Sequence, residues 1–367
     1  MLKYSVNRRK KMFSKYKQLT ARLRLPYEIL KCKVLNVYKP LVVLLYTNDR
    51  CNLACKYCVG NWSARKIDDF TTDELKKIID ECKSLGTVHF TIHGGEILLR
   101  NDTKEIIDYL KDSGMYVNLV TNGILLPEKI DDVVDVDSLC ISLDGREENN
   151  DYNRGKGTYK AVMAAIKIAR ERKLKFVVHA TLTKRSIEDV EYLCEQAKEM
   201  NYYQQFSLLL KPLTARQEDQ DLGLTDEEAR DTMRKLIELK DKGYPIFTFY
   251  PTLRNVINWP FNLSKSRLNR DEIPANADLI NCYYGKLKIS IDADGFAYPC
   301  SSLNNSFDAL NVKEVGVRKA FDHIIKTNNC EACYYLTQND WSLLLGGSMN
   351  QFINQAYIQA KGVFKRS

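Results

Sequence analysis

"PLVVLLYTNDRCNLACKYC", residues 40–58, begins as a continuous apolar run and ends in three closely spaced cysteines. Such a run is typical of a parallel strand that is buried on both faces. The spacing Cys51-x3-Cys55-x2-Cys58 lets three thiols converge on one small centre directly after the strand. A closed structural zinc site takes four ligands, whereas a site that performs chemistry often leaves one metal position open. The stretch therefore predicts a strand that ends at a reactive metal centre.

Five further strand patterns follow along the chain, with helical patterns between them. The strands are expected at 87–96, 115–123, 135–145, 175–183 and 204–212, and the helices at 71–86, 103–114, 157–173, 186–200 and 225–243. Strict alternation of this kind indicates parallel strands joined by crossover helices. Six strands are too few for a complete eight-stranded barrel. We therefore expect an α/β fold with a partial (β/α)6 TIM-like barrel, with 246–250 as one more short strand.

The alternation stops near residue 250. Residues 258–278 have the pattern of an irregular connection, and 282–300 have the pattern of a β-hairpin that turns at 292–295. Four cysteines lie in this part of the chain: Cys282, Cys300, Cys330 and Cys333. Four thiols in a tail without another obvious core indicate a metal site. A zinc ribbon and an iron–sulfur cluster are both chemically reasonable occupants.

The composition, with 44% hydrophobic and 28% charged residues, is that of a globular protein. No apolar run approaches the roughly 20 residues of a membrane-spanning helix, and the start has no secretory signal, so we expect a cytoplasmic protein. An odd total of eleven cysteines favours metal ligation over a disulfide framework.

Positive charge is concentrated at the N-terminus. Residues 1–39 hold twelve Lys or Arg and one acid, Glu28, which leaves the remainder of a +8 chain slightly acidic. Apolar residues recur there at steps of three or four: Met12 or Phe13, Tyr16, Leu19, Leu23, Tyr27 and Leu30. A basic amphipathic helix of this kind lies on anionic lipid surfaces, which would make the protein peripheral on the inner face of the membrane. The alternative is a helix packed on the barrel with a solvated basic face.

The cysteine motif, with Tyr57 before its last cysteine, resembles the signature of the radical S-adenosylmethionine (SAM) superfamily. Three other features of that family recur in order: "GGE" at 94–96, "TNG" at 121–123 and "SLDG" at 142–145, each at the end of an expected strand. The resemblance covers about residues 40–250. The chain departs from it at Ile97, where a proline is usual.

The resemblance implies a [4Fe-4S] cluster on Cys51, Cys55 and Cys58, with SAM chelating the open iron. One electron would then cleave the sulfonium to a 5′-deoxyadenosyl radical. For SAM it implies contacts of the methionine amine with Gly94, Gly95 and Glu96, of the methionine carboxylate with Ser142 and Arg154, of adenine with the backbone at Tyr57, and of the ribose with Asn122 or Asp144.

The tail pattern, with Gly295 between Cys282 and Cys300 and then Cys330-x2-Cys333, resembles the twitch domain, a shortened SPASM extension. That resemblance implies one auxiliary [4Fe-4S] cluster for electron transfer, with structural zinc as the alternative. The predicted domains are a basic amphipathic extension (1–39), the radical SAM partial barrel (40–255), a small Cys-rich twitch/SPASM-like domain with a hairpin and helices (256–340) and an amphipathic C-terminal helix (341–367).

The sequence thus predicts a radical SAM enzyme that takes a hydrogen atom from an unactivated C–H bond of a peptide or small polar substrate. A flavodoxin- or ferredoxin-like protein is the expected reductant. The alternatives are modification of a membrane lipid or isoprenoid and, from another class, a non-catalytic iron–sulfur electron carrier. A zinc-ribbon nucleic-acid binder that uses the basic N-terminus is a further rival, but we expect no nucleic-acid partner. The residue that handles the final hydrogen or proton step cannot be named from the sequence.

Overall fold

A computed structural model describes residues 24–58, 67–209, 222–304, 306–348 and 350–351. Its central feature is a curved sheet whose six parallel strands follow one another in chain order. The strands are β1 (Val42–Tyr46), β2 (His89–His93), β3 (Tyr116–Thr121), β4 (Ser138–Ser142), β5 (Phe176–Leu182) and β6 (Tyr203–Leu208). The expected partial barrel, with its six strands, is confirmed.

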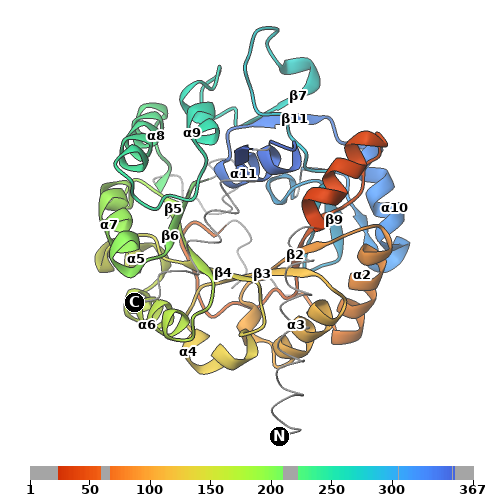
Figure 1. Ribbon diagram of the computed structural model, residues 1–367, viewed down its shortest axis with the longest axis horizontal. Coiled ribbons are helices and arrows are strands. Elements are labelled where there is room, and N and C mark those ends of the chain that lie inside the picture. Colours follow the sequence, from red (N-terminus) through yellow and green to blue (C-terminus); the bar gives the residue numbers. More distant parts are fainter. Residues whose placement is uncertain (1–23, 59–66, 210–221, 305, 349, 352–367) are drawn as a thin grey trace, which may run out of the picture.

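Helices form an outer ring around these strands (Figure 1). They are α2 (Thr72–Ser84), α3 (Thr103–Asp112), α4 (Leu126–Lys129), α5 (Glu147–Arg154), α6 (Thr158–Glu171), α7 (Val190–Met200) and α8 (Asp226–Asp241). Capping boxes at Thr71–Glu74 and Thr225–Glu228 begin α2 and α8, because each threonine and glutamate satisfy the first free backbone N–H groups of the helix. The short helices α4 and α5 were not predicted.

The burial of the strands alternates where helices cover only their outer side. In β3 every second residue is fully buried and packs with the helices, while the others, such as Tyr116 and Asn118, are half-buried. β6 shows the same alternation. The partly buried residues therefore lie on the face of the sheet that is turned away from these helices, where Tyr116 packs on His89.

The C-terminal part extends the barrel sheet. The hairpin of β8 (Lys288–Ile291) and β9 (Phe296–Tyr298) has the predicted turn, and β8 pairs in parallel with β1. With β10 (Leu310–Asn311) the sheet has nine strands in the order β10-β9-β8-β1-β2-β3-β4-β5-β6. The hairpin is thus continuous with the edge of the barrel.

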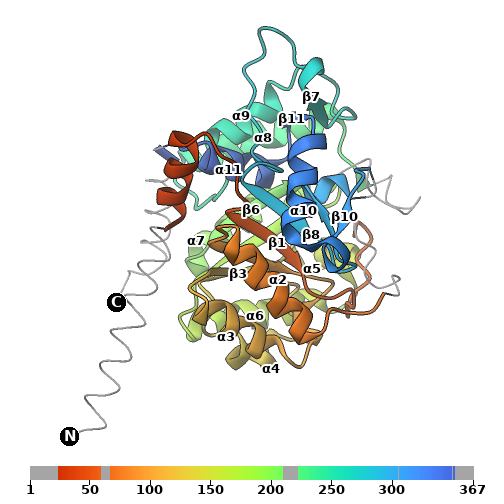
Figure 2. The same cartoon turned by 90° about the vertical axis from the view of Figure 1, so that its right-hand side faces the viewer.

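Two expectations for the C-terminal part were wrong. Residues 246–250 form no strand: Ile246 makes one isolated bridge with Gln204, and Tyr250 begins helix α9 (Tyr250–Ile257). The connection 258–278 is not wholly irregular, because β7 (Arg267–Asn269) pairs with β11 (Cys330–Cys333) beside α9 (Figure 2).

The last two helices are α10 (Val312–Thr327) and α11 (Leu336–Leu345). A C-terminal helix was expected over 341–367. In the structure α11 begins earlier, at Leu336, and ends at Leu345 with Gly346 as its cap. Residues 352–367 of the expected helix lie outside the described residues. No helix of the described chain is long and apolar enough to cross a membrane.

Of the expected N-terminal helix, only residues 24–39 are described, and 24–34 are helical. Ile29 and Cys32 pack against the barrel with Leu41 and Leu345. Tyr27 and Leu30, which belong to the apolar stripe recognised in the sequence, are instead 62% and 61% exposed.

Candidate functional site

The three cysteines of the first motif lie on the loop that follows β1, at the carboxyl edge of the sheet. Cys51 Sγ accepts a hydrogen bond from the backbone of Leu53 at 3.4 Å and lies 3.9 Å from Asn122 Nδ2. Burial raises the pKa of the Cys51 thiol and raises that of Cys55 to about 12. Without metal these thiols are therefore protonated, and metal binding has to release their protons.

The glycines at the end of β2 allow the two strand-end loops to touch. Gly95 N–H donates to Asn48 O at 3.0 Å and Glu96 N–H donates to Arg50 O at 2.8 Å. A Cβ on Gly94 would lie 2.3 Å from Asn48 Oδ1, and one on Gly95 would lie 2.3 Å from Arg50 O. Only glycine fits at both positions, so the "GGE" segment holds the backbone that leads into Cys51.

Glu96 is 2% exposed and its carboxylate joins the ends of β2 and β3. It accepts hydrogen bonds from Leu98 N at 3.0 Å, Thr121 Oγ1 at 2.9 Å and Asn122 N at 2.7 Å. Ile97, which stands in place of the usual proline, begins a short 3-10 turn that Glu96 caps. Glu96 was expected to face the methionine amine; in the structure its carboxylate positions the neighbouring loop.

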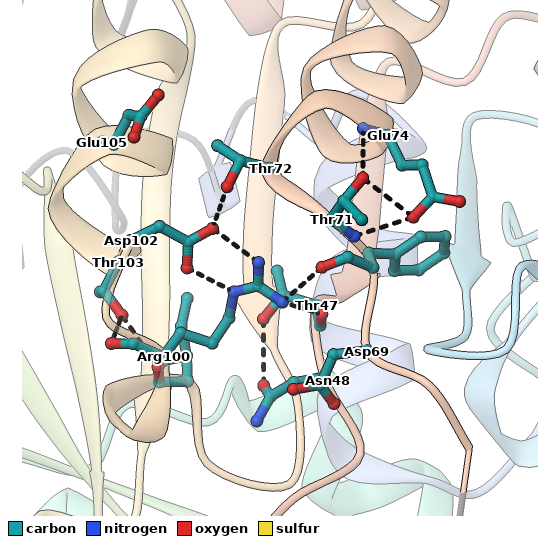
Figure 3. Close-up of polar contacts among 12 residues, drawn as sticks. Thr47, Asn48, Asp69, Thr71, Thr72, Glu74, Arg100, Asp102, Thr103 and Glu105 are labelled. Atoms are coloured by element: carbon teal, nitrogen blue, oxygen red, sulfur yellow. Dashed lines mark hydrogen bonds and ion pairs between the residues drawn. The ribbon is translucent and has the colours of Figure 1, made fainter.

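Arg100 lies between the 3-10 turn that follows Glu96 and helix α3, and the sequence analysis missed it. Figure 3 shows its contacts with Thr47 and Asp102. Its guanidinium donates to Thr47 O at 3.0 Å and Phe70 O at 2.8 Å, and it binds Asp102 through two hydrogen bonds of 2.8 and 2.6 Å. The side chain is 5% exposed. Arg100 thus fixes the end of β1 to the start of α3. Nothing in its local sequence distinguishes it from a surface arginine.

Asp144 and Arg154 form a buried pair at the end of β4. Arg154 donates from Nε and Nη2 to the two oxygens of Asp144, each at 2.9 Å. Asp144 also accepts from Tyr57 Oη at 2.5 Å and from Thr181 N at 3.0 Å. Tyr57, from the cysteine motif, is thereby joined to β4 and β5.

The two residues that were expected to contact SAM thus bind each other in the structure. Arg154 was expected to bind a carboxylate of SAM, yet Nη1 is its one guanidinium nitrogen without a hydrogen-bond partner in the described chain. Burial raises the pKa of Tyr57, and the negative charge of Asp144 adds to that effect while Arg154 opposes it.

Asn122 connects the third strand end to the cysteine loop. Its side chain donates to Asn52 Oδ1 at 2.8 Å and accepts from Ile124 N at 3.0 Å. Ser142, the last residue of β4, lies beside His179 of β5. The expected SAM-contacting residues therefore gather at one edge of the sheet, around Cys51 and Cys55.

Two histidines near this edge were also missed. His93 lies at the end of β2, with its ring 4.8 Å from that of Tyr46 and Nδ1 3.1 Å from Gly94 O. Burial lowers the pKa of His179 to about 4, and it also lowers that of His93. Both rings are therefore neutral at physiological pH. The chain has four histidines in all, and this scarcity was the signal that could have drawn attention to them.

The four cysteines of the tail line one pocket, together with Tyr284, Arg267 and Gln338. They come from three separate segments, and the described cysteines form no disulfide. Burial raises the pKa of Cys330 to about 11 and raises that of Cys282 and Cys333, and neighbouring thiols add to each shift. No three His, Cys, Asp or Glu side chains in the described ranges are arranged to hold a single metal ion. The donor set of the pocket, four thiols, fits an iron–sulfur cluster.

Residues 45–197 match the model of the Radical SAM superfamily. The chain is 35% identical over 184 residues to the AdoMet-dependent heme synthase of Methanosarcina barkeri, which covers 48% of this chain and 53% of that protein. It is 30% identical over 169 residues to the PqqA peptide cyclase of Bradyrhizobium diazoefficiens, 44% of each chain. The chain thus spans about half the length of these relatives.

Among solved structures, the fold is similar to that of Streptococcus suis SuiB bound to the precursor peptide SuiA, with a TM-score of 0.63 and 15% identity. That match covers 81% of this chain and 69% of SuiB. At this identity the likeness concerns the fold alone.

Proposed function

We propose that this chain, which carries a radical SAM domain, is an enzyme that binds its [4Fe-4S] cluster at Cys51, Cys55 and Cys58 and binds SAM across the adjacent strand ends. The observation that carries the proposal is the convergence of the ends of β2, β3 and β4 on the cysteine loop, through Gly95, Asn122 and the Tyr57–Asp144 contact. When bound, the cluster and SAM would supply a 5′-deoxyadenosyl radical, which would take a hydrogen atom from the substrate.

The chain's own residues bind and orient in this proposal. Glu96 and Asn122 hold the loops, and the backbone carbonyls of Gly94 and Gly95 would accept hydrogen bonds from the methionine amine, although Gly94 O already lies 3.1 Å from His93 Nδ1. Ser142 Oγ and Arg154 Nη1 are the donors left for the methionine carboxylate, because the other face of Arg154 is held by Asp144. A charge-assisted hydrogen bond from a preorientated arginine suits that role. The ribose would meet Asn122 or Asp144, and the adenine the backbone at Tyr57.

The substrate we propose is a peptide or a small polar molecule. Support comes from the names of the relatives, a peptide cyclase and a heme synthase, and from the peptide bound to SuiB. The inner face of the barrel sheet carries partly buried, uncharged polar side chains, including Asn118, Thr181 and Gln205. Such a lining can hydrogen-bond a polar substrate.

The tail cysteines would hold one auxiliary [4Fe-4S] cluster, and a flavodoxin- or ferredoxin-like protein would supply electrons to the enzyme. The test is anaerobic reconstitution of the full chain, followed by SAM and dithionite. We expect about eight iron atoms per chain and release of 5′-deoxyadenosine. Replacing Cys51, Cys55 and Cys58 by Ala should abolish the release and halve the iron. If the intact, iron-loaded protein releases no 5′-deoxyadenosine, the proposal is wrong and the electron-carrier alternative is favoured.

An anionic membrane surface is the partner that we propose for the N-terminal segment. Tyr27, Leu30 and Val34 are 62%, 61% and 76% exposed and recur at helical spacing on the side of the helix that faces away from Ile29 and the barrel. An exposed apolar stripe on a segment with a net charge of +11 (residues 1–39) fits an interfacial helix better than a helix packed by that face. Vesicles containing phosphatidylglycerol should co-sediment the full chain, and vesicles of phosphatidylcholine alone should not. Retention of vesicle binding when Tyr27 and Leu30 are both replaced by Ser would contradict the role of the stripe.

A further inference from the structure

Lys288 is a buried lysine beside the pocket of the tail cysteines. It is the first residue of β8 and is 3% exposed. Its Nζ lies 5.0 Å from the ring centroid of Tyr284. Tyr284 and Cys300 both line the cysteine pocket, so the lysine lies next to that pocket.

The ammonium of Lys288 has aromatic neighbours but no anion beside it. Nζ lies 4.0 Å from the ring centroid of Trp341 and 5.0 Å from that of Tyr284. No carboxylate pairs with it and no acceptor hydrogen-bonds it in the part of the chain that the structure describes. Ring faces compensate a buried cation only partly, and a buried charge is normally paired. The ammonium form of Lys288 therefore has no counter-ion among the residues that the structure describes.

The cysteine pocket supplies a suitable anion. Tyr284, whose ring the ammonium faces, lines that pocket together with all four tail cysteines. An iron–sulfur cluster held by four thiolates carries a net negative charge, since the thiolate charges exceed that of its core. Burial lowers the pKa of Lys288 to about 7, and a negative charge at Cys300 would act against this shift, so a charged cluster would favour the ammonium form.

We infer that Lys288 is the counter-charge of the auxiliary cluster and raises the reduction potential of that cluster. Reduction adds one electron to an already anionic group, and a positive charge in a poorly solvated environment stabilises the added charge. The inference rests on the proposed function, because it requires that the tail cysteines hold a cluster. Lys288 would act only through its charge on the cluster and would not contact the substrate.

Lys286 provides a matched control. It lies on the same hairpin near Cys282 and Cys330, but its Nζ pairs with Glu331 at 2.7 Å and its side chain is 22% exposed. A carboxylate and solvent thus already screen the charge of Lys286. Replacing it should therefore change the potential of the cluster much less than replacing Lys288.

The experiment uses the full chain with Cys51, Cys55 and Cys58 replaced by Ala, so that any remaining cluster is the auxiliary one. Its midpoint potential is measured by a redox titration followed by EPR. We expect Lys288→Met to lower the reduction equilibrium constant at least tenfold, which is about 59 mV for one electron. Lys286→Met should give less than half of that shift, and Lys288→Arg, which keeps the charge, should remain close to the parent.

Other results of this experiment would contradict either the role of Lys288 or the auxiliary cluster itself. A Lys288→Met shift no larger than that of Lys286→Met would overturn the inference, and so would loss of the cluster from a Lys288→Met protein with an unchanged circular dichroism spectrum. If Lys288→Met does not fold, Lys288→Gln is measured against the same threshold. A parent protein that holds no iron would contradict the auxiliary cluster itself, whereas an iron-loaded parent with insensitive potentials would contradict only the role of Lys288.

Discussion

Replacement of Gly95 by Ala tests whether close packing of two strand-end loops creates the cluster site. An alanine Cβ would lie 2.3 Å from Arg50 O, 2.6 Å from Arg50 C and 2.9 Å from Asp49 O. All three atoms belong to the backbone, so no side-chain rotation can relieve the clash. The segment that leads into Cys51 has to move, at a cost of about 1–3 kcal/mol for an overpacked contact.

The expected result is selective loss of the first cluster. Because the hydrogen bonds Gly95 N–H to Asn48 O and Glu96 N–H to Arg50 O set the position of the loop, their displacement should separate the three thiols. We expect Gly95→Ala to retain its fold by circular dichroism, to lose about four of roughly eight iron atoms per chain, and to release at least tenfold less 5′-deoxyadenosine.

Gly243→Ala is the matched control. Gly243 has φ +83° and open space around its Cβ position, so alanine costs about 1–2 kcal/mol through backbone strain alone. The control should lose similar stability and keep its iron and activity. Wild-type iron content and 5′-deoxyadenosine release in Gly95→Ala would refute the reasoning, and equal losses in both variants would attribute the effect to general destabilisation.

Three other predictions concern stability and the second cysteine set. Arg100→Met should destabilise the fold by about 2–4 kcal/mol in urea denaturation, since it leaves Asp102 unpaired, whereas Arg50→Met, at an exposed ion pair, should change stability by less than about 1 kcal/mol. Burial raises the pKa of Asp340 to about 7, so the folded state binds this proton more tightly than the unfolded state does. The resulting stabilisation of the fold is complete below about pH 4. It is lost as the pH rises through about 7. Asp340→Asn should therefore gain about 1–3 kcal/mol relative to wild type between about pH 5 and pH 8; a pH-independent difference would contradict this. Cys330→Ser should remove about half of the iron but leave reductive release of 5′-deoxyadenosine, and full loss of that release would contradict separate clusters.

Three residues that were expected to contact SAM are hydrogen-bonded to other parts of the chain in the structure. Glu96 and Asp144 appear in the sequence as free carboxylates at strand ends, and Arg154 as a free cation. In the structure Glu96 accepts three hydrogen bonds from its own chain and Arg154 shares two with Asp144. These groups hold loops in place, which is why the proposed contacts with SAM use backbone carbonyls, Ser142 and one nitrogen of Arg154.

The sequence by itself determined the six parallel strands, five of the helices that follow them, the cysteine loop after β1 and a hairpin within 282–300. These features depend on local periodicity, turn residues and short spacings, all of which lie within a few residues of one another. The missed elements α4 and α5 are short, and β7 is recognisable only through its partner β11, so local patterns gave no signal for them.

Only the tertiary structure decided the pairing of the hairpin with β1, the orientation of the N-terminal stripe, and the partners of Arg100 and Lys288. Each of these depends on segments far apart in the chain: Arg100 meets Thr47 across 53 residues, and the ring that faces Lys288 belongs to Trp341. A side chain's partner is chosen by which backbones come together after folding, and residue types along the chain do not encode that proximity locally.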